Sequence, residues 1–449
     1  MLIALRFENF RSFPGPVELR MAAHKADKSL QSSLLDGLGR GRSTYKLLPA
    51  ILIYGANAAG KTNVLKALKY MRSMVLTSHI TTNSRGGTNL HDYAFNDDPA
   101  KTSFFEVEFI YADIRYKYGF ELDSKFVKSE WLFSYPLGRE RVLFIRQTEP
   151  TDADGKYSTS VDKGDSLSGD ERYISGIAKR VREDSLFISV ARQDNLQEAR
   201  VVHDWFGDEL DIFDNNDMAF NDAARTSHMA VRYPDFKEML VALMKRSDPS
   251  IIDILITEAA HNGDLVDRFV RAWEGDPIVG VLRDAMKYDV DFVIGNANGL
   301  TQTIPFRFQS KGVQQMYRLA AGLLRTLKFG GVFIVDELES SLHPHVAHWL
   351  LDQFHDPEVN SNRAQIIATT HDTNLMDQSL LRRDQIWFVE KTGCESHLYS
   401  LLDHSPRKDE NLETGYLRGK YGALPVLAKK VNWLSEGVDN SRGSNLAWV

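Results

Sequence analysis

The stretch Ile51-Leu-Ile-Tyr-Gly-Ala-Asn-Ala-Ala-Gly-Lys-Thr62 decides how the rest of the chain is interpreted. An apolar run typical of a β-strand leads into Gly55-x-x-x-x-Gly60-Lys61-Thr62, which is the spacing of a phosphate-binding loop (P-loop). Glycines let successive backbone N–H groups turn toward phosphate oxygens, and a following helix adds its positive N-terminal end. Lys61 can reach the β- and γ-phosphates, and the Thr62 hydroxyl can bind Mg²⁺. The sequence therefore predicts a site for a nucleoside triphosphate.

The composition is that of an ordinary globular protein. The chain has 449 residues, 43% hydrophobic and 26% charged, which is enough for the cores of two or three domains. Its net charge of −7 argues against a surface built mainly for nucleic acid, although a local basic groove stays open. The single cysteine, Cys394, excludes an intrachain disulfide framework and fits a reducing compartment. Because no apolar run is long enough to span a bilayer, we expect a cytoplasmic protein without membrane contact.

The hydrophobic pattern divides the chain into four parts. Residues 1–150 are predicted to hold an opening hairpin, the P-loop with its helix, and an antiparallel meander. Residues 151–288 are predicted to be a mainly helical insertion. Residues 289–403 return to alternating strands and helices, and residues 404–449 form a mixed tail with one helix. The predicted fold class is α/β, a P-loop NTPase with an antiparallel β subdomain and a helical insertion.

Some elements can be predicted more closely. Leu2–Phe10 and Val17–Met21 alternate in strand fashion around a proline-glycine turn and predict the opening hairpin. Ser103–Leu122 predicts two strands around a tight turn. Ala22–Leu48 is rich in serine and glycine and is expected to be a loop. Thr151–Arg172 is polar, with too few apolar residues to bury, and is expected to be a mobile surface insertion.

A second motif follows a later strand. The apolar run Gly331–Val335 ends at Asp336-Glu337, which is a Walker-B arrangement. Asp336 is expected to hold Mg²⁺, and Glu337 can polarise a water for in-line attack on the γ-phosphate. A P-loop enzyme needs such an acidic strand end beside its P-loop strand, so the two motifs support each other.

A third motif opens a helix shortly before that strand. In Ser310-Lys-Gly312-Val-Gln314, a hydroxyl, a bare glycine backbone and a helix N-terminus form a second anion-binding surface. We expect Ser310, Gly312 and Gln314 to contact the phosphates of a second chain across a head-to-tail dimer. A plain loop with a capping serine is the alternative.

His371 forms the fourth element of the predicted site. It follows the strand that ends at Thr370. An imidazole at this strand end can donate a hydrogen bond to the γ-phosphate and so distinguish ATP from ADP. A lone histidine is more often structural, but His371 is fourth in the order P-loop, Ser-x-Gly, Asp-Glu, His.

The order and spacing of these elements resemble an ABC-type ATPase head, the kind found in SMC and DNA-repair ATPases and in AAA-type phage-defence ATPases. Leu2–Phe13, with Glu8-Asn-Phe-Arg-Ser-Phe13, resembles the opening hairpin of such heads, whose residues lie beside the nucleotide. The resemblance implies that Arg11 and the P-loop residues Asn57 and Gly60 contact the nucleotide, with ATP and Mg²⁺ as cofactors and ATP hydrolysis as the activity.

Two further runs narrow the resemblance. Asp336-Glu-Leu-Glu-Ser-Ser-Leu-His-Pro344 is similar to the Walker-B, D-loop and Leu-His-Pro run of the overcoming-lysogenisation-defect (OLD) family. The tail Asn411-Leu-Glu-Thr-Gly-Tyr-Leu-Arg-Gly-Lys-Tyr-Gly-Ala-Leu-Pro425 resembles the ending of ATP-binding subunits in two-gene defence systems of the RloA and AbiL type, with PARIS-type ATPases as a near relative. The chain departs from the ABC pattern at its signature, which reads Ser-Lys-Gly-Val-Gln rather than Leu-Ser-Gly-Gly-Gln.

The resemblance implies partners as well as cofactors. A head-to-tail dimer or higher homo-oligomer would form around ATP, and it would control a separately encoded toxin or nuclease, RloB-like or Toprim-like. The trigger would be a phage protein or DNA, and the role would be abortive infection.

Other functions are weighed against this one. A self-contained OLD-type nuclease carries a Toprim domain with an Asp-x-Asp pair after the ATPase, and the residues after His371 hold no such pair. A transporter subunit rarely has so large an insertion, an SMC protein needs a long coiled coil, and a GTPase needs a guanine-reading Asn/Thr-Lys-x-Asp motif. An OLD-like ATPase acting on DNA in nuclease or repair complexes is the remaining alternative.

Overall fold

The computed structural model describes most of the chain, namely residues 1–37, 45–80, 87–98, 100–150, 157–214, 219–259, 287–407 and 410–425. Within the predicted insertion and tail, residues 260–286 and 426–449 therefore lie outside the described residues. Of the helices in the described part, none combines the length and the apolar character needed to cross a bilayer.

A six-stranded sheet carries the P-loop. Its strand order is β11-β15-β16-β5-β17-β18, and neighbouring strands are parallel except for the antiparallel pair at the β18 edge. Parallel strands covered on both faces are apolar throughout, and β5 and β15 are fully buried. The strands are β5 (Ala50–Tyr54), β11 (Leu210–Phe213), β15 (Val332–Val335), β16 (Gln365–Thr369), β17 (Ile386–Thr392) and β18 (Glu395–Ser400).

The P-loop strand separates two hydrophobic cores. Ile51 and Ile53 pack into the core shared with the antiparallel sheet, whereas Leu52 and Tyr54 pack into the other. Each isoleucine or leucine buried in this way contributes about 1.5–3 kcal/mol to stability. The long helices against the sheet are α1 (Lys61–Thr77) on the first side and α9 (Lys311–Phe329) and α10 (Pro344–His355) on the second.

A seven-stranded antiparallel sheet lies beside the P-loop sheet, as predicted. Its order is β10-β9-β8-β7-β6-β1-β2. The opening hairpin and the tight turn at Ala112-Asp113, where both residues have positive φ, are confirmed. Its strands are β1 (Leu2–Glu8), β2 (Val17–Arg20), β6 (Ser103–Tyr111), β7 (Ile114–Leu122), β8 (Val127–Tyr135), β9 (Arg141–Pro150) and β10 (Tyr157–Lys163).

Two stretches predicted to be irregular contain strands. In Thr151–Arg172, predicted to be a mobile surface insertion, β10 pairs with β9 in continuous register. Its polar sequence suits an edge strand, which gains main-chain hydrogen bonds while half of its side chains stay exposed. In Ala22–Leu48, predicted to be a loop, the short strands β3 (Leu35–Gly37) and β4 (Tyr45–Leu47) pair with each other. Neither stretch has the apolar content by which strands are recognised in a sequence.

Within residues 151–288, predicted to be a mainly helical insertion, helices hold more of the described residues than strands do, but strands are also present. Besides β10, this stretch contributes β11 to the P-loop sheet, and β12 pairs with β13 in a separate three-stranded sheet. A four-residue apolar run such as β11 has no periodicity that separates a strand from a helix turn. The remaining elements are α2 (Glu171–Ala178), α3 (Phe187–Gln193), α4 (Gln197–Asp204), a π-helical turn (Trp205–Glu209), α5 (Ala219–Arg232), α6 (Pro234–Ser247), β12 (Ile251–Glu258), β13 (Tyr288–Gly295) and β14 (Thr301–Pro305).

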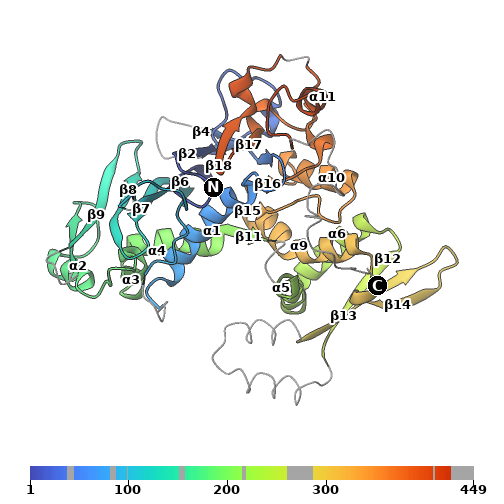
Figure 1. Ribbon diagram of the computed structural model, residues 1–449. Coiled ribbons are helices and arrows are strands. Elements are labelled where there is room, and N and C mark those ends of the chain that lie inside the picture. The colour runs from blue at the N-terminus through green and yellow to red at the C-terminus, as the bar shows by residue number, and fades with distance from the viewer. Residues whose placement is uncertain are drawn as a thin grey trace, which may run out of the picture.

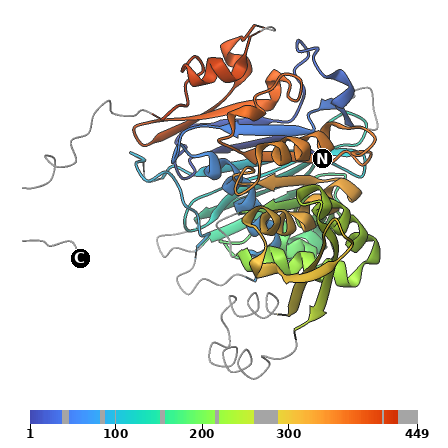
Figure 2. The ribbon, with the colours of Figure 1, turned by 90° about the vertical axis from the view of Figure 1, so that its right-hand side faces the viewer.

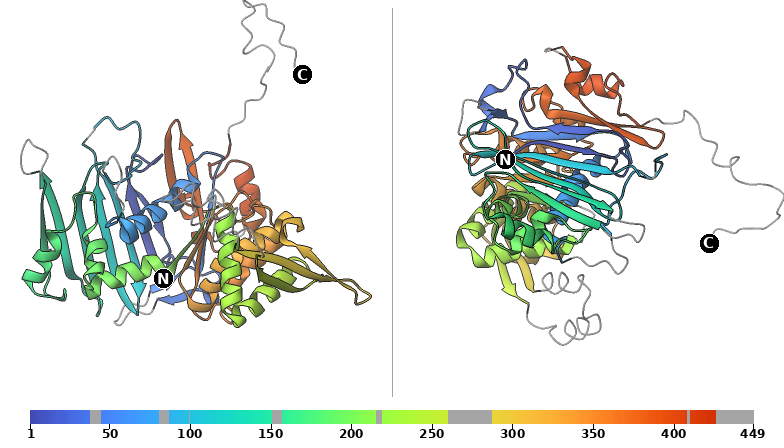
Figure 3. Two further views of the ribbon diagram at one scale, coloured as in Figure 1. Left: turned by 90° about the horizontal axis from the view of Figure 1, so that it is seen from below. Right: turned by 90° about the vertical axis from the view of Figure 1, so that its left-hand side faces the viewer.

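The sheets are arranged side by side. The antiparallel sheet and the three-stranded sheet lie on opposite sides of the P-loop sheet (Figure 1), and the view from below shows the same order (Figure 3). The β17–β18 hairpin and helix α11 (Leu412–Leu417) lie at the end of the molecule away from β12 (Figure 2). The predicted α/β fold with an antiparallel β subdomain beside the P-loop sheet is confirmed. Short 3₁₀ turns are found at Gln31–Ser33, Phe306–Phe308, Thr373–Leu375, Arg383–Gln385 and Leu401–His404.

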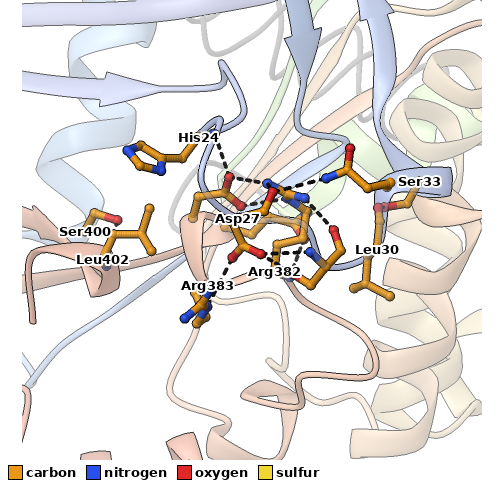
Figure 4. A network of polar contacts seen from close by, with 12 residues as sticks. His24, Asp27, Leu30, Ser33, Arg382, Arg383, Ser400 and Leu402 are labelled. Carbon is orange, nitrogen blue, oxygen red and sulfur yellow. Dashed lines mark hydrogen bonds and ion pairs between the residues drawn. The ribbon is translucent and has the colours of Figure 1, made fainter. Parts of the chain in front are cut away.

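A buried arginine network joins the segment after the opening hairpin to the turn before β17 (Figure 4). The Arg382 side chain is fully buried, and its Nε and Nη2 donate to Asp384 at 2.9 and 2.7 Å. It also donates to the carbonyls of Asp27 and Ser29. Arg383 pairs with the Asp27 carboxylate at 3.2 Å. The network fixes residues far apart in the sequence beside the P-loop sheet.

Replacing Arg382 with methionine should destabilise the protein by about 3–5 kcal/mol, because it leaves Asp384 buried without its charge partner. Urea unfolding measures the loss. The matched control is Arg20→Met, since Arg20 pairs with Glu18 at the surface and such pairs contribute about 0–1 kcal/mol. If Arg382→Met and the control unfolded at the same urea concentration, a stabilising role for the network would be contradicted.

Candidate nucleotide-binding site

The P-loop takes the conformation that its glycines predict. Gly55, Ala58 and Gly60 all have positive φ, at 153°, 59° and 111°. At Gly55 a Cβ would lie 2.3 Å from the Val389 carbonyl oxygen of the neighbouring strand β17, so a side chain is excluded. Gly60 is the N-cap of α1, which begins at Lys61. The loop therefore leads directly into a helix N-terminus, where backbone N–H groups and the helix dipole favour an anion.

The Lys61 ammonium group rests on its own loop. Its Nζ donates to the Gly55 and Ala56 carbonyls at 2.9 and 3.2 Å, and it lies 2.9 Å from His371 Nε2. Burial lowers the pKa of Lys61, and the nearby carboxylates of Glu339, Asp336 and Glu337 oppose that shift. A phosphate oxygen could replace the two carbonyls as a stronger, charged acceptor.

Thr62 and Asp336 meet between neighbouring elements of the sheet. The Thr62 hydroxyl lies 3.1 and 3.0 Å from the two Asp336 carboxylate oxygens. Thr369, at the end of β16, donates its hydroxyl to Asp336 Oδ1 at 2.6 Å and thereby orients the carboxylate. Hydroxyl and carboxylate oxygens are the donors that Mg²⁺ prefers, and this cation usually keeps water and phosphate oxygens as its other ligands. The pair therefore fits a Mg²⁺ ion bound together with a nucleotide.

Glu337 is held in an unusual backbone conformation. Its φ is 55°, and its N–H donates to the Thr369 hydroxyl at 2.7 Å. Glu337 is exposed, unlike the buried Asp336 next to it. Burial of part of its side chain and the carboxylates of Asp336 and Glu339 raise the pKa of Glu337. A carboxylate with a raised pKa is a better proton acceptor for a water molecule.

His371 lies at the end of β16 beside the P-loop. Because the Lys61 ammonium can only donate, His371 Nε2 accepts in this contact and the neutral ring carries its proton on Nδ1. The His371 backbone N–H donates to Glu339 Oε1 at 2.7 Å. Burial and the Lys61 charge lower the pKa of His371. The structure thus brings the predicted P-loop, Walker-B and histidine elements together, although they are up to 310 residues apart in the sequence.

The predicted signature residues lie elsewhere, at the N-terminus of α9. Ser310 caps this helix by accepting from the Val313 N–H, and Gln314 Nε2 donates to the Gln309 carbonyl at 2.9 Å. At Gly312 a Cβ would lie 2.9 Å from the Ser341 carbonyl oxygen. The hydrogen bonds that the structure describes for Ser310 and Gln314 are local, which is the capping role weighed as the alternative above. Of these residues, Gln314 borders a cleft of about 920 Å³ whose lining includes Lys311, Gln315, Arg318 and Tyr288.

Arg11 lies in the turn of the opening hairpin, and Asn57 lies on the P-loop itself. Arg11 has a φ of 54° and donates its backbone N–H to His91, while its guanidinium lies 5.5 Å from the Phe10 ring centroid. Burial lowers the pKa of Arg11. Asn57 is exposed on the P-loop. Their contact with a nucleotide stays a prediction.

Several residues around the site were not predicted. Ser12 Oγ lies 2.8 Å from both Asn63 Nδ2, from which it accepts, and Ser396 Oγ. Ser396 donates its one hydroxyl hydrogen to the Ala59 carbonyl at 2.5 Å, so it accepts from Ser12. A Cβ at Gly60 would clash with the hydroxyl groups of both serines, so the two serines pack directly against the P-loop at this glycine. Ser12 adjoins Arg11 in the opening hairpin, which is the only sequence signal for it. Ser396, on β18, has none.

A known protein family matches most of the chain. The family model described as "AAA domain, putative AbiEii toxin, Type IV TA system" matches residues 51–377 of this chain. This range holds the P-loop, the Walker-B pair and His371. No curated protein matches the chain.

Three solved structures are similar to the chain at low scores. The SMC head bound to the C-winged helix domain of ScpA has 13% identity over 89% of this chain and 97% of that chain, with a TM-score of 0.42. The SMC head domain from Thermotoga maritima has 14% identity over 89% and 98%, with a TM-score of 0.39. The Smc head domain with an extended coiled coil bound to the C-terminal domain of ScpA derived from Pyrococcus furiosus has 13% identity over 90% and 97%, with a TM-score of 0.37. Scores this low carry no conclusion about ligands or assembly.

Proposed function

The chain belongs to the AAA-domain family whose description connects it with the AbiEii toxin of type IV toxin–antitoxin systems, and on that premise we propose that it binds and hydrolyses ATP. We propose further that it dimerises or forms a higher oligomer around ATP. In this state it controls a separately encoded toxin or nuclease in abortive defence against phage.

One observation carries the ATPase proposal: a lysine, a hydroxyl, two carboxylates and an imidazole converge at one edge of the P-loop sheet. They come from the ends of β5, β15 and β16, and parallel strands present their carboxyl ends to the same edge. The convergent groups are Lys61, Thr62, Asp336, Glu337 and His371. These are the groups that phosphoryl transfer to water needs.

The roles follow from the contacts. The P-loop N–H groups and Lys61 bind the β- and γ-phosphates, and Lys61 leaves the Gly55 and Ala56 carbonyls to do so. Thr62 and Asp336 would hold Mg²⁺, and the ion would supply positive charge beside the phosphate oxygens. Glu337 accepts the proton of the attacking water. His371, released from Lys61, is then available to the γ-phosphate.

The oligomer proposal rests on the position of the signature. In one chain Ser310 and Gln314 bond to residues of their own segment, and Gln314 borders a cleft that no P-loop residue lines. We propose that a second chain brings them to the phosphates. A head-to-tail dimer would place the signature of each chain over the P-loop of the other. Two composite sites would then close together, which lets ATP control assembly.

Mixing two inactive chains tests the composite site. In a heterodimer of Ser310→Arg and Lys61→Ala chains, one site keeps both a native P-loop and a native signature. If chains exchange freely, half of the dimers are mixed, and the mixture should recover about a quarter of wild-type ATPase activity. Steady-state phosphate release measures it.

The matched control mixes Glu337→Gln with Lys61→Ala chains. Both changes fall on the P-loop side of the site, as the contacts around Thr369 place Glu337, so no site in the heterodimer is intact. This mixture should stay inactive. Equal activity in both mixtures, or none in the first, would count against catalysis across the dimer.

A further inference from the structure

Glu339 lies beside the proposed ATP site, although none of the proposed roles uses it. Its Oε1 accepts the His371 backbone N–H at 2.7 Å. Its Oε2 is buried and has no hydrogen-bond partner among the described residues. An unpaired buried carboxylate oxygen is costly, so packing alone does not explain why a glutamate stands here.

The charge of Glu339 acts on the ammonium group of Lys61 and on the imidazole of His371, which contact each other. Of the nearby carboxylates, Glu339 is the strongest influence that opposes the lowering of the Lys61 pKa by burial. It also opposes the lowering of the His371 pKa by burial and by Lys61. Lys61 Nζ and His371 Nε2 are 2.9 Å apart. The Glu339 charge acts through space on both members of this pair, and its carboxylate also accepts the His371 backbone N–H.

Glu339 differs from Glu337 in its exposure and in the groups that it contacts. Glu337, with its left-handed backbone, is exposed and is suited to act on a water molecule. Glu339 is partly buried and bonds to the backbone at the end of β16. The two carboxylates, two residues apart, therefore differ in exposure and in hydrogen-bond partner.

We propose that Glu339 is a positioning residue for ATP hydrolysis, which holds His371 at the strand end when Lys61 moves from His371 to the phosphates. The inference rests on the proposed function. In the resting contact, Lys61 itself fixes His371 Nε2. Once the phosphates attract Lys61, the bond from the His371 N–H to Glu339 keeps the imidazole in place to meet the γ-phosphate. Without that bond, the groups that bind ATP are intact, and the group that acts on the γ-phosphate is misplaced.

Steady-state ATP hydrolysis by three variants tests the proposal. Glu339→Ala should lower kcat about tenfold, the effect of losing one charge-assisted hydrogen bond, while KM for ATP changes less than about threefold. Glu339→Gln keeps an acceptor for the His371 N–H and should recover most of kcat. The matched control is Glu358→Ala, which removes an exposed glutamate on the turn after α10 and should leave both constants unchanged.

A double-mutant cycle separates positioning from a general loss of stability. If Glu339 acts through His371, Glu339→Ala should lower kcat no further in a His371→Ala background. The proposal would be overturned if the two substitutions lowered kcat multiplicatively in the double variant. It would also be overturned if Glu339→Ala kept the wild-type kcat, or if Glu339→Ala and Glu339→Gln lost kcat equally. If Glu339→Ala fails to fold, Glu339→Asp, with its shorter reach, should show the same fall in kcat at unchanged KM, and wild-type constants there would overturn it. A wild-type protein that hydrolyses no ATP would instead refute the proposed function.

Discussion

Replacing Glu337 with glutamine is expected to abolish ATP turnover while ATP binding is kept. Glutamine has nearly the same shape, but its amide cannot accept the proton of the attacking water. Loss of a general base lowers kcat by about 10²–10⁴-fold, which makes this the largest effect expected for a single change. Lys61, Thr62 and Asp336 remain in place, so the affinity for ATP should stay within about threefold of wild type.

The same variant should trap the assembled state. If ATP holds two chains together and hydrolysis releases them, the Glu337→Gln protein with ATP and Mg²⁺ should remain a dimer or larger species in light scattering. ADP in place of ATP should leave it unassembled. The matched control is Glu358→Gln, at an exposed glutamate away from the site, which should hydrolyse ATP at the wild-type rate. Normal hydrolysis by Glu337→Gln would remove Glu337 as the base.

Replacing Lys61 with alanine is expected to weaken ATP binding by about 10–100-fold. The ammonium group is the charged donor to the β- and γ-phosphates, and a hydrogen bond to a charged group contributes about 1.5–3 kcal/mol. Isothermal titration calorimetry measures the affinity directly. The loss should be smaller for AMP, which has no β- or γ-phosphate for the lysine to reach.

Removal of Lys61 also changes the resting site. His371 loses the ammonium group that lowers its pKa, so the pKa of His371 should rise, and NMR titration of the ring can follow this shift. Lys46→Ala is the control, because Lys46 is paired with Asp36 at the surface and away from the P-loop. Unchanged ATP affinity in Lys61→Ala would contradict the P-loop assignment.

Much of the nucleotide site could be predicted from the sequence because its motifs follow strand ends. A run of apolar residues followed by Gly55–Thr62, by Asp336-Glu337 or by His371 places each group at the carboxyl end of a buried strand. Parallel strands in one sheet bring those ends together. The local backbone therefore specifies these positions before the order of the strands is known.

Strands within residues 151–288 could not be predicted from the hydrophobic pattern of the sequence. Residues 151–288 are predicted to be a mainly helical insertion, and the strands β10, β11 and β12 within it, which join three different sheets, are not predicted. β10 is polar and β11 has only four residues, whereas β12 is an eight-residue strand rich in isoleucine. Each is stabilised by hydrogen bonds to a partner strand. Such pairing energy depends on the partner and leaves no periodic pattern in the strand itself.

By itself, the sequence determined the P-loop, the Walker-B pair and the histidine at the strand end, because glycine conformation, strand burial and helix polarity are local properties. Only the tertiary structure decided which groups meet. It places β16 between β5 and β15, so that Thr369 orients Asp336 and His371 reaches Lys61. It also leaves Glu337 exposed and joins the partly buried Glu339 to the His371 backbone. These contacts depend on the order of the strands and on the left-handed backbone at Glu337. Neither feature can be predicted from the local sequence pattern.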